Sequence, residues 1–383
     1  MRKILALADC NNFFVSCEIL KNPALKGLPV CVLSNCDGCV ISRSNEAKKI
    51  GIPMGMPLFK AKKEFPDAIY LSSDFKLYHQ ISKRFQAILK DFAPNVEVCS
   101  IDEAFLEVTE LYKLYNLNGY DELAEFLHKK IKRELGIPVS IGISTSKFLC
   151  KLATDKAKKA DFYYFLPFEK IKEEIDDYKI EDIWGIGRNT AAFLRAYGIF
   201  TAGDILKKDK SFFEYFMGKR GLELKFGLEG ENVLPVITEE HKPKSIQKTA
   251  SFPKVTNNKK FLEKSVLNHL HNACRKMRRY NLSATELTVM LRTKDFRIIT
   301  ASSVINPCTS SEFILNKMAV SLLNKIYSEY ILFRSSGVYV SGLKDSEYMQ
   351  KDFFFNNERF EKLSAITDKL EQKYGKNCLK IGV

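Results

Sequence analysis

The chain has 383 residues, of which 45% are hydrophobic and 28% are charged. This is an ordinary globular composition, so it excludes a disordered or fibrous protein, and the length predicts roughly two to four domains. The sequence has no apolar run of about 18 residues, which argues against a membrane-spanning helix. The short apolar stretch 4–8 is stopped by Asp9, so we expect no signal peptide.

The formal net charge is +14, and the excess of basic residues is concentrated in one segment. Residues 242–344 hold 18 basic and 5 acidic side chains, a local net charge of +13, and the rest of the chain has a net charge of +1. A basic segment beside a balanced remainder predicts a module that binds a polyanion. The alternative is a basic domain that is merely soluble.

The ten cysteines follow no regular framework, so we expect reduced thiols in a cytoplasmic protein. Cys36 and Cys39 form a Cys-x-x-Cys pair, but no second pair complements them. One such pair alone is weak evidence for zinc.

Up to about residue 165, short apolar strands alternate with amphipathic helices. The expected strands are 3–8, 29–33, 96–100, 104–108 and 139–144, and the expected helices are 13–20, 44–50, 75–92 and 120–135. Helix 75–92 is the best defined, because its apolar residues recur at spacings of three and four. Asn11 is the expected cap of the first helix. This order predicts a mixed sheet with helices on one face.

Residues 167–236 contain helical patterns broken by glycines, which predict a small helical domain without strands. The polar stretch 238–243 is the expected linker. The basic segment then predicts strand 244–252, helix 258–280, strands 284–292 and 298–304, helix 311–330 and strand 334–340. This βαββαβ order is typical of a ferredoxin-like split unit. The remaining tail is aromatic-rich and then helical.

Three carboxylates stand where apolar strands end: Asp9 after the first strand, and Asp102 and Glu103 after 96–101. Strand ends can meet at one rim of a sheet, where three carboxylates repel one another unless divalent cations hold them. The alternative is that each acid caps a helix or a turn. Consecutive strand residues point to opposite faces, so Asp102 and Glu103 can share a site only if the chain turns there.

The strings around these carboxylates resemble those of the Y-family translesion DNA polymerases. DCNNFFVSCE at 9–18 is followed by SIDEAF at 100–105, and the two motifs in this order are highly specific. The strings at 33–41 and 45–48 resemble the UmuC branch, the catalytic subunit of DNA polymerase V, more closely than the DinB branch. The resemblance covers essentially the whole chain and continues through Gly142, Ile143, Ser144, Lys147, Lys151, Ala153, Lys158 and the string WGIGR at 184–188.

The resemblance implies an α+β multidomain, right-hand polymerase fold. Its implied parts are a ferredoxin-like palm (1–19 and 77–166), small fingers (20–76), a helical thumb with a helix-hairpin-helix-like turn (167–237), a βαββαβ little finger (242–344) and a C-terminal tail (345–383). It also implies template-directed addition of deoxynucleotides to a primer 3′-hydroxyl, with low fidelity and low processivity. We expect no proofreading, because no second carboxylate constellation is left over.

By the same resemblance, Asp9, Asp102 and Glu103 are catalytic and bind two Mg²⁺ ions, with the backbone carbonyl of Cys10 as a further ligand. In a two-metal site, one ion activates the primer hydroxyl and the other neutralises the triphosphate and the leaving pyrophosphate. Hard oxygen ligands suit Mg²⁺.

Phe14 matches the family's steric gate, an aromatic ring that clashes with a ribose 2′-hydroxyl. Phe13 beside it is the alternative gate, and either ring can instead be a core residue. The positions that match triphosphate contacts are Ser42, Lys48 and Lys158, whose donors offset phosphate charge. Asn45 and Lys48 stand where the DinB branch has Tyr and Arg, so the grip on the nucleotide is expected to differ.

Two regions are expected to hold DNA. Gly185, Gly187 and Arg188 would let backbone N–H groups approach a phosphate at a helix start, although a plain helix-helix turn is the alternative. In the basic segment, even spacing predicts that each of two sets lines one face of a strand along the duplex. These sets are Lys242, Lys244 and Lys248, and Arg292 and Lys294. The helical cations Arg275, Lys276, Arg278 and Arg279 are expected to be a solvated face.

The string QKDFFF at 350–355 resembles the peptide with which such polymerases bind a sliding clamp, with Gln350, Phe353 and Phe354 as anchors. The alternative is a surface aromatic patch. The resemblance also implies primer-template DNA and deoxynucleoside triphosphates as partners, and a UmuD-like accessory subunit and a recombinase filament. It further implies a cytoplasmic, bacterial-type protein of the SOS response that joins the nucleoid when it binds DNA, and no membrane partner.

Two rival functions stay open at this point. A catalytically silent DNA-binding scaffold of DNA repair is disfavoured by the intact Asp9, Asp102 and Glu103. A palm-type nucleotide cyclase would explain these carboxylates, but it would not explain the basic βαββαβ segment or the helical domain.

Overall fold

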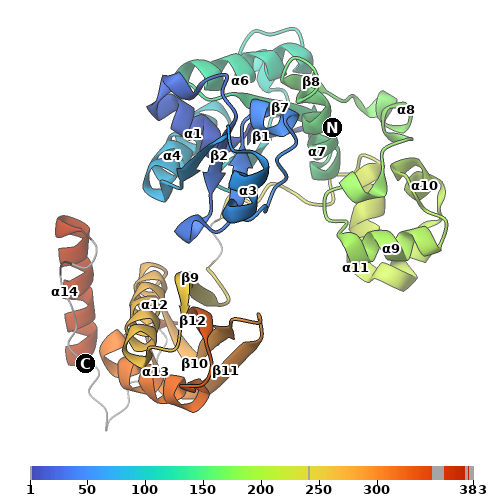
Figure 1. The fold of residues 1–383 in the computed structure, drawn as a ribbon. Coiled ribbons are helices and arrows are strands. Elements are labelled where there is room, and N and C mark those ends of the chain that lie inside the picture. Colours follow the sequence, from blue (N-terminus) through green and yellow to red (C-terminus); the bar gives the residue numbers. More distant parts are fainter. Residues whose placement is uncertain (1, 240–241, 347–357, 376–377, 379–383) are drawn as a thin grey trace. The chain divides into compact units, whose positions relative to one another are not determined.

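The computed structural model describes residues 2–239, 242–346, 358–375 and 378. The chain forms two compact units, residues 1–239 and 240–383, which are considered one at a time (Figure 1). None of the described helices is long and apolar enough to cross a lipid bilayer.

A five-stranded mixed sheet forms the centre of the first unit, with the order β5-β6-β1-β7-β8. Its strands are β1 (Leu5–Cys10), β5 (Val96–Val98), β6 (Glu103–Glu107), β7 (Val139–Ser144) and β8 (Tyr163–Phe165). Strands β7 and β8 are parallel, whereas the other neighbours are antiparallel. The middle strand β1 is fully buried from Leu5 to Ala8, as its continuous apolar sequence predicts.

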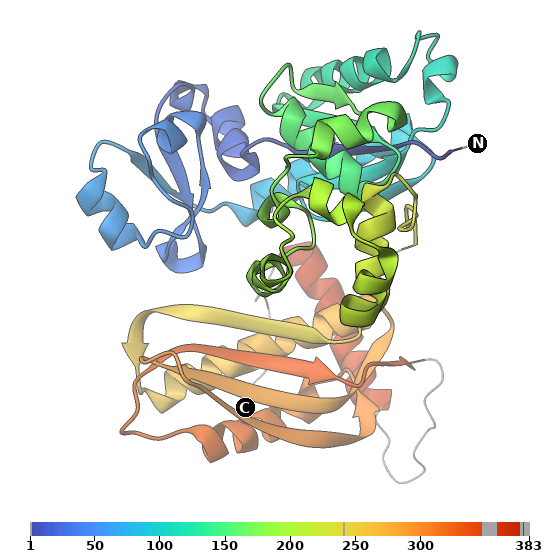
Figure 2. The same cartoon turned by 90° about the vertical axis from the view of Figure 1, so that its right-hand side faces the viewer.

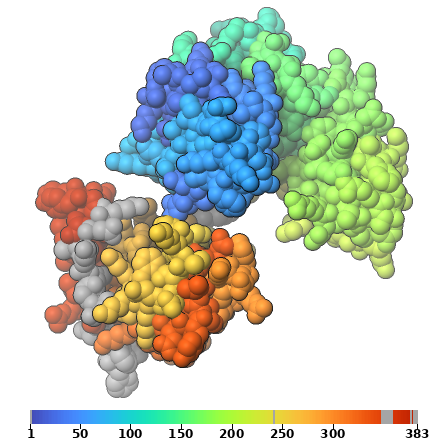
Figure 3. All heavy atoms as spheres, viewed as in Figure 1, coloured from blue at the N-terminus to red at the C-terminus, as the bar shows by residue number. Residues whose placement is uncertain are grey.

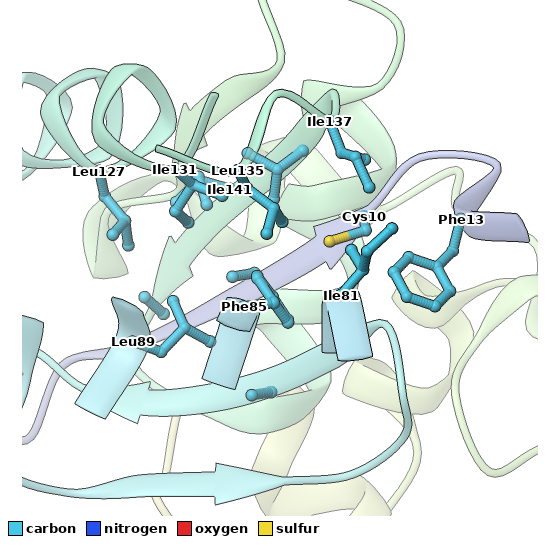
Figure 4. Close-up of a cluster of buried hydrophobic side chains, with 14 of the residues drawn as sticks. Cys10, Phe13, Ile81, Phe85, Leu89, Leu127, Ile131, Leu135, Ile137 and Ile141 are labelled. Atoms are coloured by element: carbon cyan, nitrogen blue, oxygen red, sulfur yellow. The ribbon is translucent and has the colours of Figure 1, made fainter. Parts of the chain in front are cut away.

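Helices cover both faces of this sheet. Helices α4 (Phe75–Phe92) and α6 (Tyr120–Leu135) pack their apolar faces on one side (Figure 4). Helix α7 (Lys147–Ala157) packs on the other side, where Cys150 joins a cluster with sheet residues. The expectation of helices on one face was therefore wrong. The physical reason is that β7 and β8 are parallel, so the chain needs a crossover between them, and α7 provides it.

The first helix begins at Phe13, as predicted, but its cap is Asn12 and not Asn11. Helix α1 (Phe13–Lys21) has Asn12 as its N-cap, in a left-handed conformation and without a side-chain cap hydrogen bond. The side chain of Asn11 instead accepts a hydrogen bond from the Ser140 hydroxyl, at 3.0 Å. Asn11 therefore ties β1 to β7 rather than capping the helix.

Two smaller parts complete the first unit. A three-stranded sheet of order β3-β2-β4 has a small core of its own. It comprises β2 (Val30–Leu33), β3 (Val40–Arg43), β4 (Ile69–Ser72), α2 (Asn45–Lys49) and α3 (Leu58–Glu64). Residues 167–239, all described, contain no strand, as predicted for 167–236, and residues 167–234 form a helical lobe that is green in Figure 3. Its helices are α8 (Ile171–Ile175), α9 (Arg188–Ala196), α10 (Ala202–Lys207) and α11 (Lys210–Leu228), and the short α5 (Leu111–Leu114) lies before α6.

The second unit has the predicted βαββαβ order. Its main elements are β9 (Ile246–Thr256), α12 (Lys259–Arg279), β10 (Leu282–Thr293), β11 (Ile298–Thr309), α13 (Glu312–Ile326) and β12 (Phe333–Ser341), and a short β13 (Lys344–Asp345) pairs with β10. The strand order is β11-β10-β12-β9, and all neighbours are antiparallel. Helix α12 therefore connects the parallel strands β9 and β10, which are separated by β12, and α13 connects β11 and β12, which are separated by β10. This topology confirms the predicted split unit. Both helices lie behind the sheet, and its other face is open (Figure 2).

The C-terminal helix α14 (Glu358–Tyr374) packs on α12 and α13 through charged side chains, and also through contacts of Ser364 with Ser311 and of Phe360 with Phe313. This ionic network consists of His271, Arg275, Arg278, Glu312, Asp368 and Glu371. Arg278 forms a two-pronged pair with Asp368, at 2.7 and 2.8 Å, and also donates to Glu312. The sequence predicted that Arg275 and Arg278 belong to a solvated face, and this prediction was wrong. Both side chains are paired with acids that are distant in the sequence, mainly Asp368 and Glu371.

The network holds its carboxylates in the charged form. Burial by itself would raise the pKa of Glu312, but the hydrogen bond with His271 and the positive charge of Arg278 lower it to about 2. The pKa of His271 is raised, chiefly by its hydrogen bond with Glu312. A carboxylate that is about 1% exposed is tolerated here because it pairs with the Arg278 guanidinium and shares a hydrogen bond with His271.

Replacing Arg278 with methionine should release α14. The change leaves Glu312 buried without its main partner, which costs about 3–5 kcal/mol in comparable buried pairs. Hydrogen exchange followed by mass spectrometry should show faster exchange in the peptides that cover 358–374. The matched control is Arg279→Met, because Arg279 is the exposed neighbour on the same helix and its replacement should change stability by no more than ~0.5 kcal/mol. Unchanged exchange in the Arg278 variant would contradict this role of the network.

Candidate active site

The pairing of β1 with β6 brings two of the three predicted carboxylates together. Asp9 lies directly opposite Glu103 in the antiparallel register, so both side chains emerge on the same face of the sheet. Leu5 and Leu7, which have the same parity as Asp9, pack with Cys150 of α7. The carboxylates therefore lie on the α7 face, at the end of its apolar cluster.

The third carboxylate lies in the tight connection between β5 and β6. The backbone N–H groups of Cys99 and Ser100 both donate to the carbonyl of Glu103, at 3.1 and 3.2 Å. The backbone N–H of Cys10 donates to the carbonyl of Asp102 at 2.8 Å, which fixes this turn against β1. The chain thus turns just before Glu103, which meets the condition for Asp102 and Glu103 to share a site.

Lysines of α7 face these carboxylates. Spacings of four and seven place Lys147, Lys151 and Lys158 on one side of the helix and its C-terminal extension. Lys151 pairs with Glu103, and the Nζ atom of Lys158 lies 3.2 Å from Asp9. These lysine–carboxylate pairs neutralise the acids.

Asp9 has a shifted pKa. Burial raises the pKa of its carboxyl group, and the negative charge of Asp102 adds to the rise, whereas Lys158 and Lys151 lower it. The net pKa lies above the usual value.

The donor set fits a hard divalent cation, but the side chains are not arranged around one. In the described part of the chain, no three His, Cys, Asp or Glu side chains are placed to hold a metal ion together. Asp9 and Glu103 are instead turned to their lysines. Two facing carboxylates and a third in the adjacent turn supply the oxygen ligands that Mg²⁺ prefers, provided that the lysines give way. The Cys10 thiol cannot contribute, because it is buried in the core on the opposite face (Figure 4).

Two cations beside the three-stranded sheet lie near the same site: Arg43 on β3 and Lys48 on α2. Lys48 donates to Asn12, whose side-chain amide donates to Asn45 at 3.0 Å. Burial lowers the pKa of Lys48, and the positive charges of Arg43 and Lys158 lower it further. Lys48, Arg43 and Lys158 therefore form a group of positive charge next to Asp9, which suits a polyphosphate. Sequence reasoning missed Arg43, whose only signal was its place beside Ser42.

The Ser42 hydroxyl serves the protein's own backbone. Ser42 is 8% exposed, and its Oγ atom accepts a hydrogen bond from the backbone N–H of Val15 at 3.4 Å. This contact ties β3 to the first turn of α1. The predicted phosphate contact by Ser42 would have to compete with this bond.

Phe13 and Phe14 lie in different environments. Phe13 is 3% exposed and points into the core next to Ile81 and Cys10 (Figure 4). Phe14 is half-buried at the edge of this core, with its ring centroid 4.7 Å from that of Tyr78. Of the two rings, Phe14 is the more accessible, which favours it as the gate.

The glycine-containing turn leads into α9. Gly185 has a φ of +88°, which only glycine adopts readily, and a β-carbon at Gly185 or Gly187 would meet nothing within 4 Å. Ile183 and Ile186 are buried and anchor the turn, so the glycine backbone faces open space. Arg188 is the first residue of the helix, directly after these glycines.

Of the predicted lysines of the second unit, Lys248 does not share a face with Arg292. Lys248 pairs in register with Val338, a core residue under the helices, and its charge lowers the pKa of His269 on α12. Lys248 therefore lies on the helix-covered side, and its prediction as part of a DNA-facing row was wrong. The reason is that Lys248 shares the parity of Ile246, which is 2% exposed in the core, whereas Lys242 and Lys244 precede strand β9. Lys242 pairs with Asp345.

The open face of this sheet is lined mainly by hydroxyl groups. The paired residues on this face that carry hydroxyls are Thr249, Ser251, Thr288, Thr300, Ser302, Ser335, Tyr339 and Ser341. Arg292 lies opposite Ser335 on this face, and Lys294 is exposed just beyond the strand. Small polar side chains of this kind bind phosphate oxygens without adding charge. The predicted clamp anchors Gln350, Phe353 and Phe354 lie outside the described residues, between β13 and α14.

Comparisons with known proteins agree with this geometry. The model of the impB/mucB/samB family matches residues 8–155, and the model of its C-terminal domain matches residues 243–353. DNA polymerase IV of Dehalococcoides mccartyi (strain CBDB1) is 32% identical over 98% of this chain and 95% of its own length. Protein UmuC of Salmonella typhimurium is 30% identical over 98% of this chain and 92% of its own length.

Solved structures give the same result. A Y-family DNA polymerase chimera of Dbh and Dpo4 is 28% identical and superposes with a TM-score of 0.73, covering 89% of this chain and 99% of its own. An insertion ternary complex of Dbh DNA polymerase has a TM-score of 0.60 at 28% identity, covering 88% of this chain and 98% of its own. The chain therefore belongs to the impB/mucB/samB family, and it is a Y-family, DNA-directed DNA polymerase of the translesion type.

Proposed function

We propose that this polymerase adds deoxynucleotides to a primer 3′-hydroxyl at a site formed by Asp9, Asp102 and Glu103. The observation that carries the proposal is the register that sets Asp9 opposite Glu103, with Asp102 in the adjoining turn. Two Mg²⁺ ions held there, with the Cys10 carbonyl as a further ligand, would lower the pKa of the primer hydroxyl and offset the charge of the triphosphate and the leaving pyrophosphate.

The lysines of α7 have two partners in this proposal. Without a cation, Lys151 and Lys158 hold Glu103 and Asp9 and relieve the repulsion between the acids. When the carboxylates are engaged elsewhere, the same ammonium groups are available to the phosphates of the nucleotide, together with Lys48. Arg43 adds a further positive charge to this group. The chain thus orients the triphosphate with its own cations and forms no covalent intermediate.

The rest of the chain is assigned around this centre. The five-stranded sheet is the palm, residues 20–76 are the fingers and residues 167–237 are the thumb. The turn at Gly185 and Gly187 is proposed to bind a DNA phosphate with its backbone N–H groups and Arg188. The little finger is proposed to lay its hydroxyl-lined face along the duplex backbone, giving sequence-tolerant contacts.

The branch and the protein partners are finer proposals. Relatives named DNA polymerase IV and Protein UmuC match at similar identity, so the UmuC branch rests on the strings at 33–41 and 45–48. Clamp binding through residues 350–355, a UmuD-like subunit and a recombinase filament rest on the family resemblance. None of the relatives reported above is named as a scaffold or a nucleotide cyclase.

Replacing Asp102 with alanine should abolish primer extension with Mg²⁺, by at least about 100-fold, because the turn loses its carboxylate ligand. DNA affinity measured by fluorescence anisotropy should change little, since Asp102 is not a proposed DNA contact. The control is Asp161→Ala, which removes an exposed carboxylate of the same unit. Normal extension by the Asp102 variant would exclude this residue from the site.

Replacing Phe14 with alanine should admit ribonucleotides, because the ring that would clash with a 2′-hydroxyl is removed. Single-nucleotide incorporation kinetics should show that the preference for deoxynucleotides falls about tenfold or more. Phe75→Ala is the matched control, because Phe75 is 48% exposed and its ring centroid lies 6.0 Å from that of Phe14. Unchanged sugar discrimination in the Phe14 variant would refute the gate assignment.

Arg292 and Lys248 should differ in their effect on DNA binding, since they lie on opposite faces of one sheet. Arg292→Ala should weaken DNA binding and reduce the slope of log affinity against log salt by about 1. Lys248→Ala should leave both quantities nearly unchanged. The measurement is a salt titration of DNA binding by the full chain. An equal loss in both variants would mean that the open face does not carry the contact.

A further inference from the structure

The last described residues of the first unit leave the helical lobe and cross onto the five-stranded sheet. Val233 and Leu234 pack with the core of the helical lobe. Val236 instead packs with the sheet cluster of Leu5, Leu7, Phe105 and Cys150. The chain thus reaches the α7 face of the sheet just before it continues toward the second unit.

A single carboxylate oxygen holds this segment at its end. The backbone N–H of Ile237 donates to Oε2 of Glu97 at 2.6 Å. The same oxygen accepts a hydrogen bond from Nζ of Lys147, also at 2.6 Å. Because Glu97 is on β5 and Lys147 starts α7, this oxygen joins the sheet, the helix and the departing chain.

The pair is partly buried, which makes it a firm anchor. The side chain of Lys147 is 5% exposed and that of Glu97 is 21% exposed. Lys147 also lies over the ring of Phe105, 5.3 Å from its centroid. A buried ammonium group requires a charged partner, so Lys147 fixes the position of Glu97, and a charged acceptor strengthens the bond from the Ile237 N–H.

Glu97 differs from the other acids that face the lysine row. Lys151 and Lys158 pair with Glu103 and Asp9, which are proposed metal ligands, whereas Glu97 holds a backbone N–H. Glu97 lies two residues before the turn 99–102 that carries Asp102. The anchor of the departing chain and the catalytic carboxylates are therefore on the same β5–β6 hairpin.

We propose that Glu97, oriented by Lys147, is a positioning residue that clasps the start of the connection between the two units onto the catalytic hairpin. The connection then begins at residue 238 on the sheet, instead of at residue 235 on the helical lobe. A shorter, fixed connection raises the effective concentration of the second unit at DNA held by the first. This functional part rests on the proposed polymerase function, whereas the clasp itself does not.

Two independent changes remove the clasp while keeping the fold. The double variant Glu97→Leu with Lys147→Met removes both charges, so that no unpaired ammonium group stays buried. Ile237→Pro removes only the backbone donor, because proline has no N–H, and Ile237→Ala is its matched control that keeps the donor. All variants are made in the full chain, and thermal unfolding checks that they are folded.

The direct readout is hydrogen exchange in peptides that cover 233–239. Loss of a charge-assisted hydrogen bond should accelerate exchange there about 10- to 100-fold in the double variant and in Ile237→Pro, and not in Ile237→Ala. Dissociation of primer-template DNA should become about twofold faster or more in the same two variants. Single-turnover incorporation by DNA complexes formed beforehand should be unchanged. A general loss of stability would instead lower this rate as well.

Unchanged exchange in both the double variant and Ile237→Pro would overturn the clasp. Faster exchange with unchanged DNA dissociation would overturn its function as a positioning device. If the unaltered chain extends no primer, the proposed function fails, but the exchange measurement still decides whether Glu97 holds Ile237. The two failures are therefore distinguishable.

Discussion

The pairing of the lysine row of α7 with the carboxylates of the five-stranded sheet is the interaction on which the first unit depends. Carboxylates on neighbouring strands repel one another, and without counter-charges the register that sets Asp9 opposite Glu103 would be penalised. The lysines reach them only because α7 lies very close to the sheet. Gly142 permits this approach, since a β-carbon there would lie 2.3 Å from the backbone nitrogen of Thr154.

In the proposed function, this arrangement would let a charge-balanced unit hold metal ions and a triphosphate in turn. A rigid acidic cluster would bind cations tightly but would be costly to maintain without them. Lysines that move from the carboxylates to the phosphates would offset negative charge both without and with the nucleotide. In the proposed reaction, Lys147 does not move from its carboxylate to a phosphate, unlike Lys151 and Lys158. The Glu97–Lys147 pair can therefore serve as a fixed anchor.

The sequence predicted the bounds of helices and strands better than it predicted which face of a sheet a side chain lies on. Strand β7 and helix α6 have the predicted bounds, because they have local signatures. Asp9 and Glu103 lie opposite each other in register, and Asp102 lies in the adjoining turn. Parity showed that Lys248 shares a side with Ile246, but it did not say which side the helices cover. The contact between Glu97 and Ile237 could not be predicted, because Ile237 contributes its backbone N–H and not its side chain. The network around Arg278 joins residues about 90 positions apart, beyond the reach of local patterns.

Part of the positive charge of the basic segment is neutralised within the folded second unit. Arg275, Arg278 and Lys242 are paired with acids at 345–371, which lie outside the segment of net charge +13. Apart from Arg292, the open sheet face carries many neutral hydroxyls, and contacts made by these groups would add little to counterion release. In the proposed function, the exposed basic residues of this segment would act mainly at a distance, by attracting DNA before contact. Affinity through neutral hydrogen bonds and capture through charge would then be separate properties of the second unit.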